Sequence, residues 1–461
     1  DGQADLQKPP GYYWMVAACG WLNGGEVNAF VARLPAALAG LAAVLLVYLY
    51  LRREGRPTAA LIAALALATA VHFTAISRTA RIDVPLTCAV TAALLAFHRG
   101  CCHREGEALA ESQPRRRLGW SLALPRSGRL GWHLLSAVAA AVGVMLKGPV
   151  ALALVGPVAV VWLVTERKPR YGRGGAFPSL PLSSALLGTF LLLALALPWF
   201  VWANQTTGGE FARVFFWHHN VERFTGASQT LASYPWWYYV PRFAVDFLPW
   251  TPPLVLLAVW TGRSGQCNED RLFRFGVVWF AVMFVVLSAA RFKRSDYLLP
   301  LFPGAAITLG CAGEAWLASR TDPRTVRRAW WGFGVVIALV VVGWQVMTFA
   351  VEPAEQAKEE KRAFAAMIRQ HAPPPNEVLL FRTESHLLAF HLGRPLYTLV
   401  EWMDLNDRLA EPGPHFVVMP PEYVYPAHQI VTSRRLVVVA RLEDYTTDTP
   451  PRPLVFLRTA D

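Results

Sequence analysis

The sequence predicts a polytopic α-helical membrane protein with a small α/β domain at its C-terminal end. Of the 461 residues, 54% are hydrophobic and only 16% are charged. The mean hydropathy is +0.31, so the chain is more apolar than ordinary soluble domains. Its apolar residues gather in long segments separated by basic loops, and this pattern stops near position 351. We therefore expect a transmembrane domain over 1–351 and a second domain over 352–461.

The apolar segments supply about ten candidate spans, since a spanning helix needs about 20 apolar residues, and fewer where neighbours shield it. Arg52, Arg53 and Arg56 follow the first segment. Because basic loops stay in the cytoplasm, residues 1–28 are expected outside. The expected spans are 29–51, 59–76, 84–97, 133–146, 150–164, 186–203, 247–261, 275–290, 298–317 and 330–351.

The residues after position 352 are then expected on the outer side of the membrane. An amphipathic helix is predicted over 354–370, and three successive prolines at 373–375 end it. Short buried strands are predicted at 378–381, 416–419, 436–442 and 454–457. These elements together predict a small extracytoplasmic α/β domain.

Charge and cysteine usage exclude two other classes of protein. The formal net charge is +12, but the basic residues fall mostly in short loops, where they set membrane orientation. We therefore expect no nucleic-acid partner. The six cysteines lie almost entirely in or beside apolar segments, which predicts no disulfide framework.

Because the chain begins with Asp in a polar stretch, we expect a preceding membrane helix to be missing from the sequence.

Four basic clusters lie on the expected outer side, against the orientation rule. Fixed Lys and Arg groups near a low-dielectric boundary stabilise the charge of a phosphate leaving group, and a lipid-linked phosphate explains their position. The alternative is that each binds headgroup phosphates or extends to the membrane surface. The clusters are Lys8; Arg78 and Arg81; Lys147; and Arg291, Lys293 and Arg294.

Asp83 is the candidate catalytic carboxylate. It lies between the outer ends of two expected spans, where it can orient a cation or act as a base. It also precedes Pro85, so it suits a helix N-cap that accepts backbone N–H bonds. Both interpretations remain open from the sequence.

Aromatic residues crowd the large outer loop and the stretch after Lys8. Aromatic faces suit both sugar rings and prenyl chains, although an interfacial aromatic belt is the alternative. His218 and His219 are possible metal ligands, but adjacent residues on regular structure point in different directions, and we assign no metal ligand. The candidate substrate-binding residues are Tyr12, Tyr13, Asn220, Arg223, Trp237, Tyr238 and Tyr297.

The order of several motifs resembles the aminoarabinose transferase and protein mannosyltransferase group, which are integral-membrane glycosyltransferases of the C-type fold. The likeness covers residues 7–310 and depends on the order of the motifs rather than on any one of them. The main ones are Lys8-Pro9-Pro10-Gly11-Tyr12-Tyr13-Trp14, Arg81-Ile82-Asp83-Val84-Pro85, Leu146-Lys147-Gly148-Pro149 and Lys293-Arg294-Ser295-Asp296-Tyr297-Leu298-Leu299-Pro300.

This resemblance implies a polyprenyl-phosphate sugar as donor, undecaprenyl phosphate being the usual carrier in bacteria. Transfer is expected at the outer face of the cytoplasmic membrane, with inversion of the anomeric centre. By resemblance, Lys8 holds the donor phosphate, Lys147 and the 291–294 turn assist, and Asp83 matches the second acidic site. The principal acid of the family is expected upstream of Lys8. The acceptor stays open between lipid A, another glycan, a polyprenyl-linked intermediate and a protein.

Two departures from the aminoarabinose pattern bear on metal binding and on the sugar. In these enzymes Glu often precedes the Lys, and His often occurs in the aromatic loop. This chain has Gln7 before Lys8 and Asn220 in the aromatic loop. A divalent metal is therefore not assigned, although His218 and His219 keep it open. The same departures argue against aminoarabinose as the sugar.

Two other functions fit less well. A transporter or lipid flippase predicts ionisable residues deep in the spans and, in many folds, internal repeats. Most spans here lack such residues, and no convincing repeat is present. Oligosaccharyltransferases resemble one another by a Trp-Trp-Asp motif in the soluble domain, whereas the C-terminal region has only Trp402.

Overall fold

The computed structural model describes residues 6, 8–110, 128–166, 180–225, 234–356, 360–383, 385–443 and 453–460. The chain divides into two compact units, one over residues 5–340 and one that contains residues 341–461. The division falls inside a long helix, α14 (Pro323–Val346).

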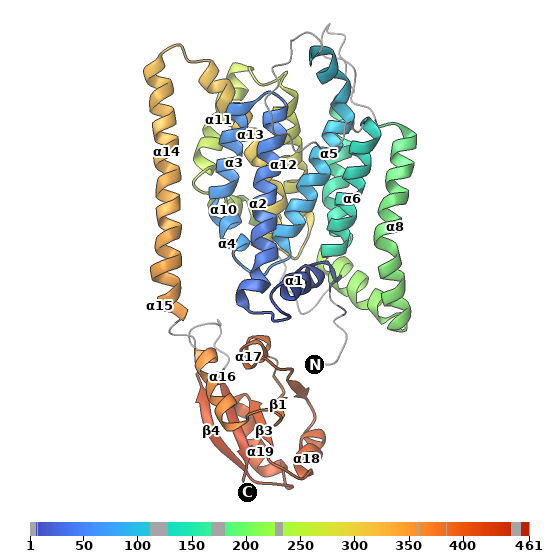
Figure 1. Ribbon diagram of the computed structural model, residues 1–461, viewed down its shortest axis with the longest axis vertical. Helices are drawn as coiled ribbons and strands as arrows, with labels where there is room; N and C mark the ends of the chain where they lie inside the picture. Colours follow the sequence, from blue (N-terminus) through green and yellow to red (C-terminus); the bar gives the residue numbers. More distant parts are fainter. Residues whose placement is uncertain are drawn as a thin grey trace. The chain divides into compact units, whose positions relative to one another are not determined.

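The first unit is a bundle of helices (Figure 1). Its helices are α1 (Gly11–Leu22), α2 (Ala29–Arg53), α3 (Pro57–Thr69), α4 (Val71–Ser77), α5 (Asp83–Ala110), α6 (Arg129–Lys147), α7 (Val150–Glu166), α8 (Leu182–Thr206), η1 (Ala212–Glu222), α9 (Arg223–Thr225), η2 (Trp236–Tyr238), α10 (Tyr239–Asp246), α11 (Thr251–Ser264), α12 (Arg271–Ala289), η3 (Ser295–Leu301), α13 (Phe302–Ala318) and the first part of α14.

The expected membrane fold is confirmed. The described residues contain seven helices long and apolar enough to cross a membrane, or nine if each of two bent pairs counts as one span. The shorter apolar helix α7 is additional. Buried residues of α3, α5, α12 and α13 form the common core, in which α13 is almost entirely enclosed.

Two expected spans differ in shape from the sequence prediction. The span at 59–76 bends by 62° between α3 and α4. The span at 247–261 is only the 14-residue helix α11, and α10 precedes it at an angle of 108°. Pro249 disfavours helical geometry at Leu248, which separates the two helices. The sequence analysis also missed α1, which starts directly after the Pro9-Pro10 pair.

Ion pairs gather at the end of the bundle where α2, α7 and α13 finish and α3 and α12 begin. Arg56 pairs there with Asp270 at 2.8 Å and also with Glu314. Arg274 pairs with Glu166 at 2.6 Å. The sequence analysis places Arg56 in a cytoplasmic loop, and the helix directions bring Arg274 to the same end of the bundle.

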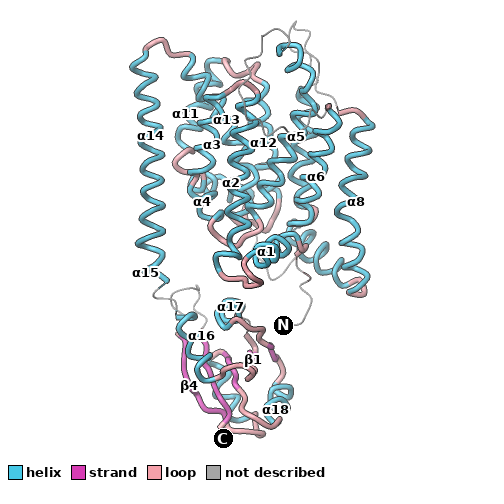
Figure 2. The backbone as a smooth tube through the Cα atoms, viewed as in Figure 1, coloured by secondary structure: helices cyan, strands magenta, loops and turns pink. Residues whose placement is uncertain are grey.

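The C-terminal unit contains, among the described residues, all the strands of the chain (Figure 2). They are β1 (Val378–Phe381), β2 (Tyr397–Leu399), β3 (Phe416–Met419), β4 (Leu436–Leu442) and β5 (Leu454–Thr459). They form one sheet in the order β2-β1-β3-β5-β4, in which β2, β1 and β3 are parallel and β5 pairs antiparallel with β3 and β4.

Helices supply two apolar clusters to this sheet. α16 (Glu360–His371) and α17 (His386–Leu392) contribute to one cluster, and α18 (Trp402–Ala410) and α19 (Val424–Ile430) to the other. Alternate residues of β1 and β3 enter different clusters, as the two-residue period of a strand requires. The expected α/β character is thus confirmed, whereas β2, α17, α18 and α19 are elements that the sequence analysis missed.

Candidate functional site

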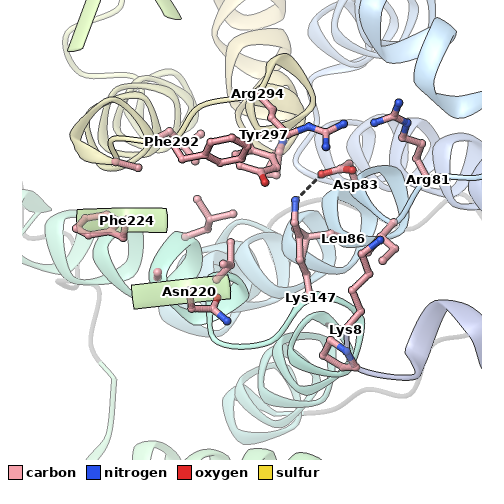
Figure 3. Close-up of a pocket in the computed structure, with 18 of the residues that line it drawn as sticks. Lys8, Arg81, Asp83, Leu86, Lys147, Asn220, Phe224, Phe292, Arg294 and Tyr297 are labelled. Atoms are coloured by element: carbon pink, nitrogen blue, oxygen red, sulfur yellow. Dashed lines mark hydrogen bonds and ion pairs between the residues drawn. The ribbon is translucent and has the colours of Figure 1, made fainter. Parts of the chain in front are cut away.

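A cavity of about 540 Å³ (Figure 3) is lined by residues at the end of α6 and the start of α5, at the end of the bundle opposite to the arginine pairs. Its wall combines cations, one carboxylate and many apolar or aromatic groups. The sequence-predicted site residues that line it are Lys8, Tyr12, Tyr13, Arg81, Asp83, Lys147, Asn220, Arg294 and Tyr297.

Lys147 and Asp83 form a close ion pair in this wall. Lys147 is the last residue of α6 and Asp83 the first of α5, and Lys147 Nζ donates to Asp83 Oδ1 at 2.6 Å. Nζ also lies 4.0 Å from the centre of the Tyr297 ring, a cation–π contact. Asp83 therefore orients a cation in this structure. It is the first helical residue, not the N-cap residue before it.

Gly148 fixes the direction in which Lys147 leaves its helix. Its φ of +75° lies in the left-handed region, which favours glycine. A Cβ atom at this position would also collide with the ring of Phe215. The turn at 148 thus brings Lys147 and the aromatic segment η1 to the same cavity.

Arg81 and Arg294 enter the wall from different segments and meet at Asp296. Arg81 Nη1 and Arg294 Nη2 both donate to Asp296 Oδ2, at 2.6 and 3.2 Å. Tyr239 donates its hydroxyl to the backbone carbonyl of Arg294 at 3.1 Å. The two arginine side chains remain 41% and 47% exposed, so further N–H groups are accessible.

Lys8 lies at the rim, with an exposed side chain. Its neighbour Pro9 is buried, and the first turn of α1 packs against the end of α6, where Gly11 leaves no room for a side chain beside Met145. The Tyr12 hydroxyl donates to the carbonyl of Ala32 at 2.9 Å, and burial raises the pKa of Tyr12 to about 12. Tyr12 thus anchors the segment that carries Lys8.

The opposite part of the wall is aromatic and apolar. Asn220 donates its amide to the Phe215 carbonyl at 2.7 Å, which fixes the side chain within η1. Phe224 and Phe292 face the same cavity (Figure 3). A cavity with cations on one part of its wall and rings on another suits an anionic group attached to an apolar chain or a sugar ring.

Five predicted site residues do not line the cavity. Lys293 is 2% exposed, and its Nζ donates to the carbonyls of Ala290 and, at 3.4 Å, of Tyr234, so it closes the turn after α12. Burial and the charge of Arg291 lower the pKa of Lys293. Trp237 is 53% exposed. The five are Arg78, Arg291, Lys293, Trp237 and Tyr238, while the side chain of Arg223 lies outside the described residues.

Sequence analysis missed the carboxylate that joins the arginines. Asp296 lies in the same turn as Arg294. Nothing in its sequence position indicated that Arg81, from a distant loop, would donate a hydrogen bond to it. The aromatic residues Phe224 and Phe292 were also not singled out. Only the fold brings these groups together.

Within the described part of the chain, no group of three or more His, Cys, Asp or Glu side chains could hold a metal ion. The side chains of His218 and His219 lie outside that part. A divalent metal therefore stays unassigned.

Comparisons with known proteins show what the chain is similar to. The family model of the dolichyl-phosphate-mannose-protein mannosyltransferases (PMT) matches residues 7–111. An undecaprenyl phosphate-alpha-4-amino-4-deoxy-L-arabinose arabinosyl transferase of Edwardsiella ictaluri is 28% identical over 349 residues, 74% of this chain and 56% of that protein. Its namesake in Pseudomonas aeruginosa is 31% identical over 310 residues, 67% of this chain and 50% of that protein.

The solved structure of ArnT from Cupriavidus metallidurans bound to undecaprenyl phosphate superposes with a TM-score of 0.71 and 21% identity, over 98% of this chain and 88% of that chain. The chain is ArnT/PMT-like. The sequence matches confirm the resemblance that the motif order indicates, and the superposition confirms the expected fold. The ArnT/PMT-like chain spans about half the length of the curated relatives that it matches.

Proposed function

We propose that this protein transfers a sugar from a polyprenyl-phosphate donor, of the undecaprenyl-phosphate type, to an acceptor hydroxyl. The reaction takes place at the outer face of the cytoplasmic membrane and inverts the anomeric centre. The observation that carries this proposal is the convergence of Lys8, Arg81, Lys147 and Arg294 on one cavity beside apolar walls. The names of the curated relatives support the same donor class.

The cations act on the leaving group. As the bond between the anomeric carbon and the phosphate oxygen breaks, negative charge grows on the lipid phosphate, and fixed cations at a low-dielectric boundary stabilise it. Lys147 is already oriented by Asp83, so it needs little reorganisation. An arriving phosphate competes with Asp83 for Lys147, and a carboxylate released in this way can accept the acceptor's proton.

The remaining cations have different parts. Lys8 is exposed at the rim and is suited to meet the phosphate first, while Arg81 and Arg294 offer forked donors that match phosphate oxygens. By family resemblance, the principal acid belongs to a segment upstream of Lys8. The residues described here therefore account for holding and releasing the donor phosphate, and not for the whole reaction.

A transfer assay tests the proposal. Full-length protein is incubated with a radiolabelled polyprenyl-phosphate sugar and a membrane fraction that supplies acceptors, and label in the acceptor is measured. We expect transfer by the wild type and at least a tenfold loss in Lys8→Ala, because one charge-assisted phosphate contact is worth about 1.5–3 kcal/mol. Movement of the labelled lipid across liposomes without transfer would instead support a flippase.

A further inference from the structure

Asp296 lies behind the cavity wall and joins two of its cations. Its side chain is buried, and its Oδ2 atom accepts hydrogen bonds from both Arg81 and Arg294. One oxygen therefore holds two guanidinium groups close together, as Figure 3 shows for the arginine side chains. Because like charges repel at this range, the carboxylate is needed to keep the pair together.

A second layer of buried groups supports the other carboxylate oxygen. Asp296 Oδ1 accepts from Ser295 Oγ at 3.3 Å, and His72 Nε2 lies 3.6 Å away, within ion-pair range but beyond a hydrogen bond. The other ring nitrogen, His72 Nδ1, lies 3.8 Å from Asp246 Oδ1. Asp246 Oδ2 in turn accepts from Arg242 Nε at 2.9 Å. These contacts join α4, α10 and η3 behind the wall.

Such a buried network is costly to form. Carboxylates removed from water are stable only when they are paired, and well-packed apolar groups often serve stability equally well. One end of the network is formed by Arg81 and Arg294, which line the cavity and remain partly exposed, and the other end is Arg242. Its placement therefore points to the geometry of the cavity rather than to stability alone.

We propose that Asp296, supported by His72 and Asp246, is a positioning residue that fixes the spacing of Arg81 and Arg294 for one phosphate group. Asp296 does not touch the phosphate in this arrangement. It holds one N–H of each guanidinium, which leaves other N–H donors of both groups directed to a shared anion. This inference rests on the proposed function, since it assigns the phosphate of the donor lipid to that cavity.

The experiment is a binding titration of the full-length protein in detergent with undecaprenyl phosphate. Positioning and simple charge balance predict opposite signs for Asp296→Asn. If Asp296 positions the arginines, its loss weakens binding about tenfold, because the forked contacts are lost. If Asp296 only neutralises the arginines, its loss removes a competing anion and strengthens binding, which overturns the proposal.

Three further variants sharpen this test. Asp296→Glu keeps the charge but moves the carboxylate, so positioning predicts weaker binding and charge balance predicts no change. His72→Gln probes the second layer, and a smaller loss of affinity is expected. Asp270→Asn removes one carboxylate from the ion pair with Arg56 at the opposite end of the bundle, and its affinity should equal that of the wild type.

Folding and the parent proposal are controlled separately. The thermal unfolding midpoint of each variant is compared with that of the wild type. If Asp296→Asn does not fold, Arg81→Lys replaces it, since lysine keeps the charge without the fork; unchanged affinity then overturns the inference. If Lys8→Ala also leaves affinity unchanged, the donor-phosphate proposal itself fails. If Lys8→Ala binds undecaprenyl phosphate more weakly and Asp296→Asn binds it more tightly, the donor-phosphate proposal stands and only the positioning role of Asp296 is overturned.

Discussion

Lys147 and Asp83 form an ion pair that bears on both stability and the proposed sugar transfer. Asp83 is 8% exposed, so removal of its partner leaves a carboxylate buried without compensation. We expect Lys147→Met to lower the free energy of unfolding by about 1–3 kcal/mol. The loss is limited to this range because Lys147 is itself partly exposed. The measurement is denaturant unfolding in detergent.

A double variant distinguishes this explanation from a general packing defect. Lys147→Met with Asp83→Asn removes both charges, and its stability should lie above that of Lys147→Met alone. If the losses of unfolding free energy from Lys147→Met and from Asp83→Asn simply add in the double variant, the two side chains do not interact. Both variants are expected to reduce sugar transfer, so stability and transfer are measured on the same preparations.

Gly148 offers a second prediction at the scale of one residue. Gly148→Ala combines a strained left-handed φ with a collision against Phe215, and we expect a loss of about 2–4 kcal/mol in unfolding free energy. Gly24 is the matched control. Its φ is +73°, but no atom lies within 4 Å of an added Cβ, so Gly24→Ala should cost only about 1 kcal/mol. Equal losses of unfolding free energy in Gly148→Ala and Gly24→Ala would exclude a collision with Phe215.

Individual site residues were predictable where the membrane makes a charge unusual. Cations on the expected outer side identified Lys8, Arg81, Lys147 and Arg294, all of which line the cavity. The same argument also selected Lys293, which is buried against backbone carbonyls. Charge alone cannot tell a ligand-binding lysine from one that closes a turn, because both sit beside the same helix ends.

At the scale of elements, the sequence predicted where the long helices lie better than where they bend. Hydrophobic runs gave the positions of the long helices, and apolar runs of a few residues gave β1, β3 and β4 with their observed bounds. The bends at α3–α4 and α10–α11 were missed, since an apolar segment has the same composition whether straight or bent. β2 was also missed; its residues are not fully buried and carry little apolar signal.

Close packing of α3 against α13 is the element-scale feature most open to test. An added Cβ at Gly310 would come within 2.5 Å of the Ala59 carbonyl oxygen. Gly310→Ala should therefore force the two helices apart and cost about 1–3 kcal/mol in unfolding free energy.

Gly332 is the control for this substitution. It lies in α14, and an added Cβ meets no atom within 4 Å. Gly332→Ala should be neutral or stabilising by up to about 1 kcal/mol, because alanine is the better helix former. If Gly310→Ala were equally harmless in thermal unfolding, the close approach of α3 and α13 would be wrong.

At the scale of the whole molecule, the candidate site is formed by distant segments that meet at one end of the bundle. Residues from α1, α5, α6, η1 and η3 line one cavity, although they are separated by long stretches of sequence. The topology rule placed the basic members on a common side, but the supporting residues Asp296, His72 and Asp246 could not be predicted. Their role depends on tertiary contacts that leave no periodic pattern.

The most direct test of the central claim compares two lipids that differ only in the phosphate. Binding of undecaprenyl phosphate and of neutral undecaprenol to the full-length protein is measured side by side in one detergent. We predict that the wild type binds the phosphate lipid at least tenfold more tightly, and that Lys8→Ala loses most of this preference. Equal affinity of the wild type for the two lipids would contradict a phosphate site in this cavity.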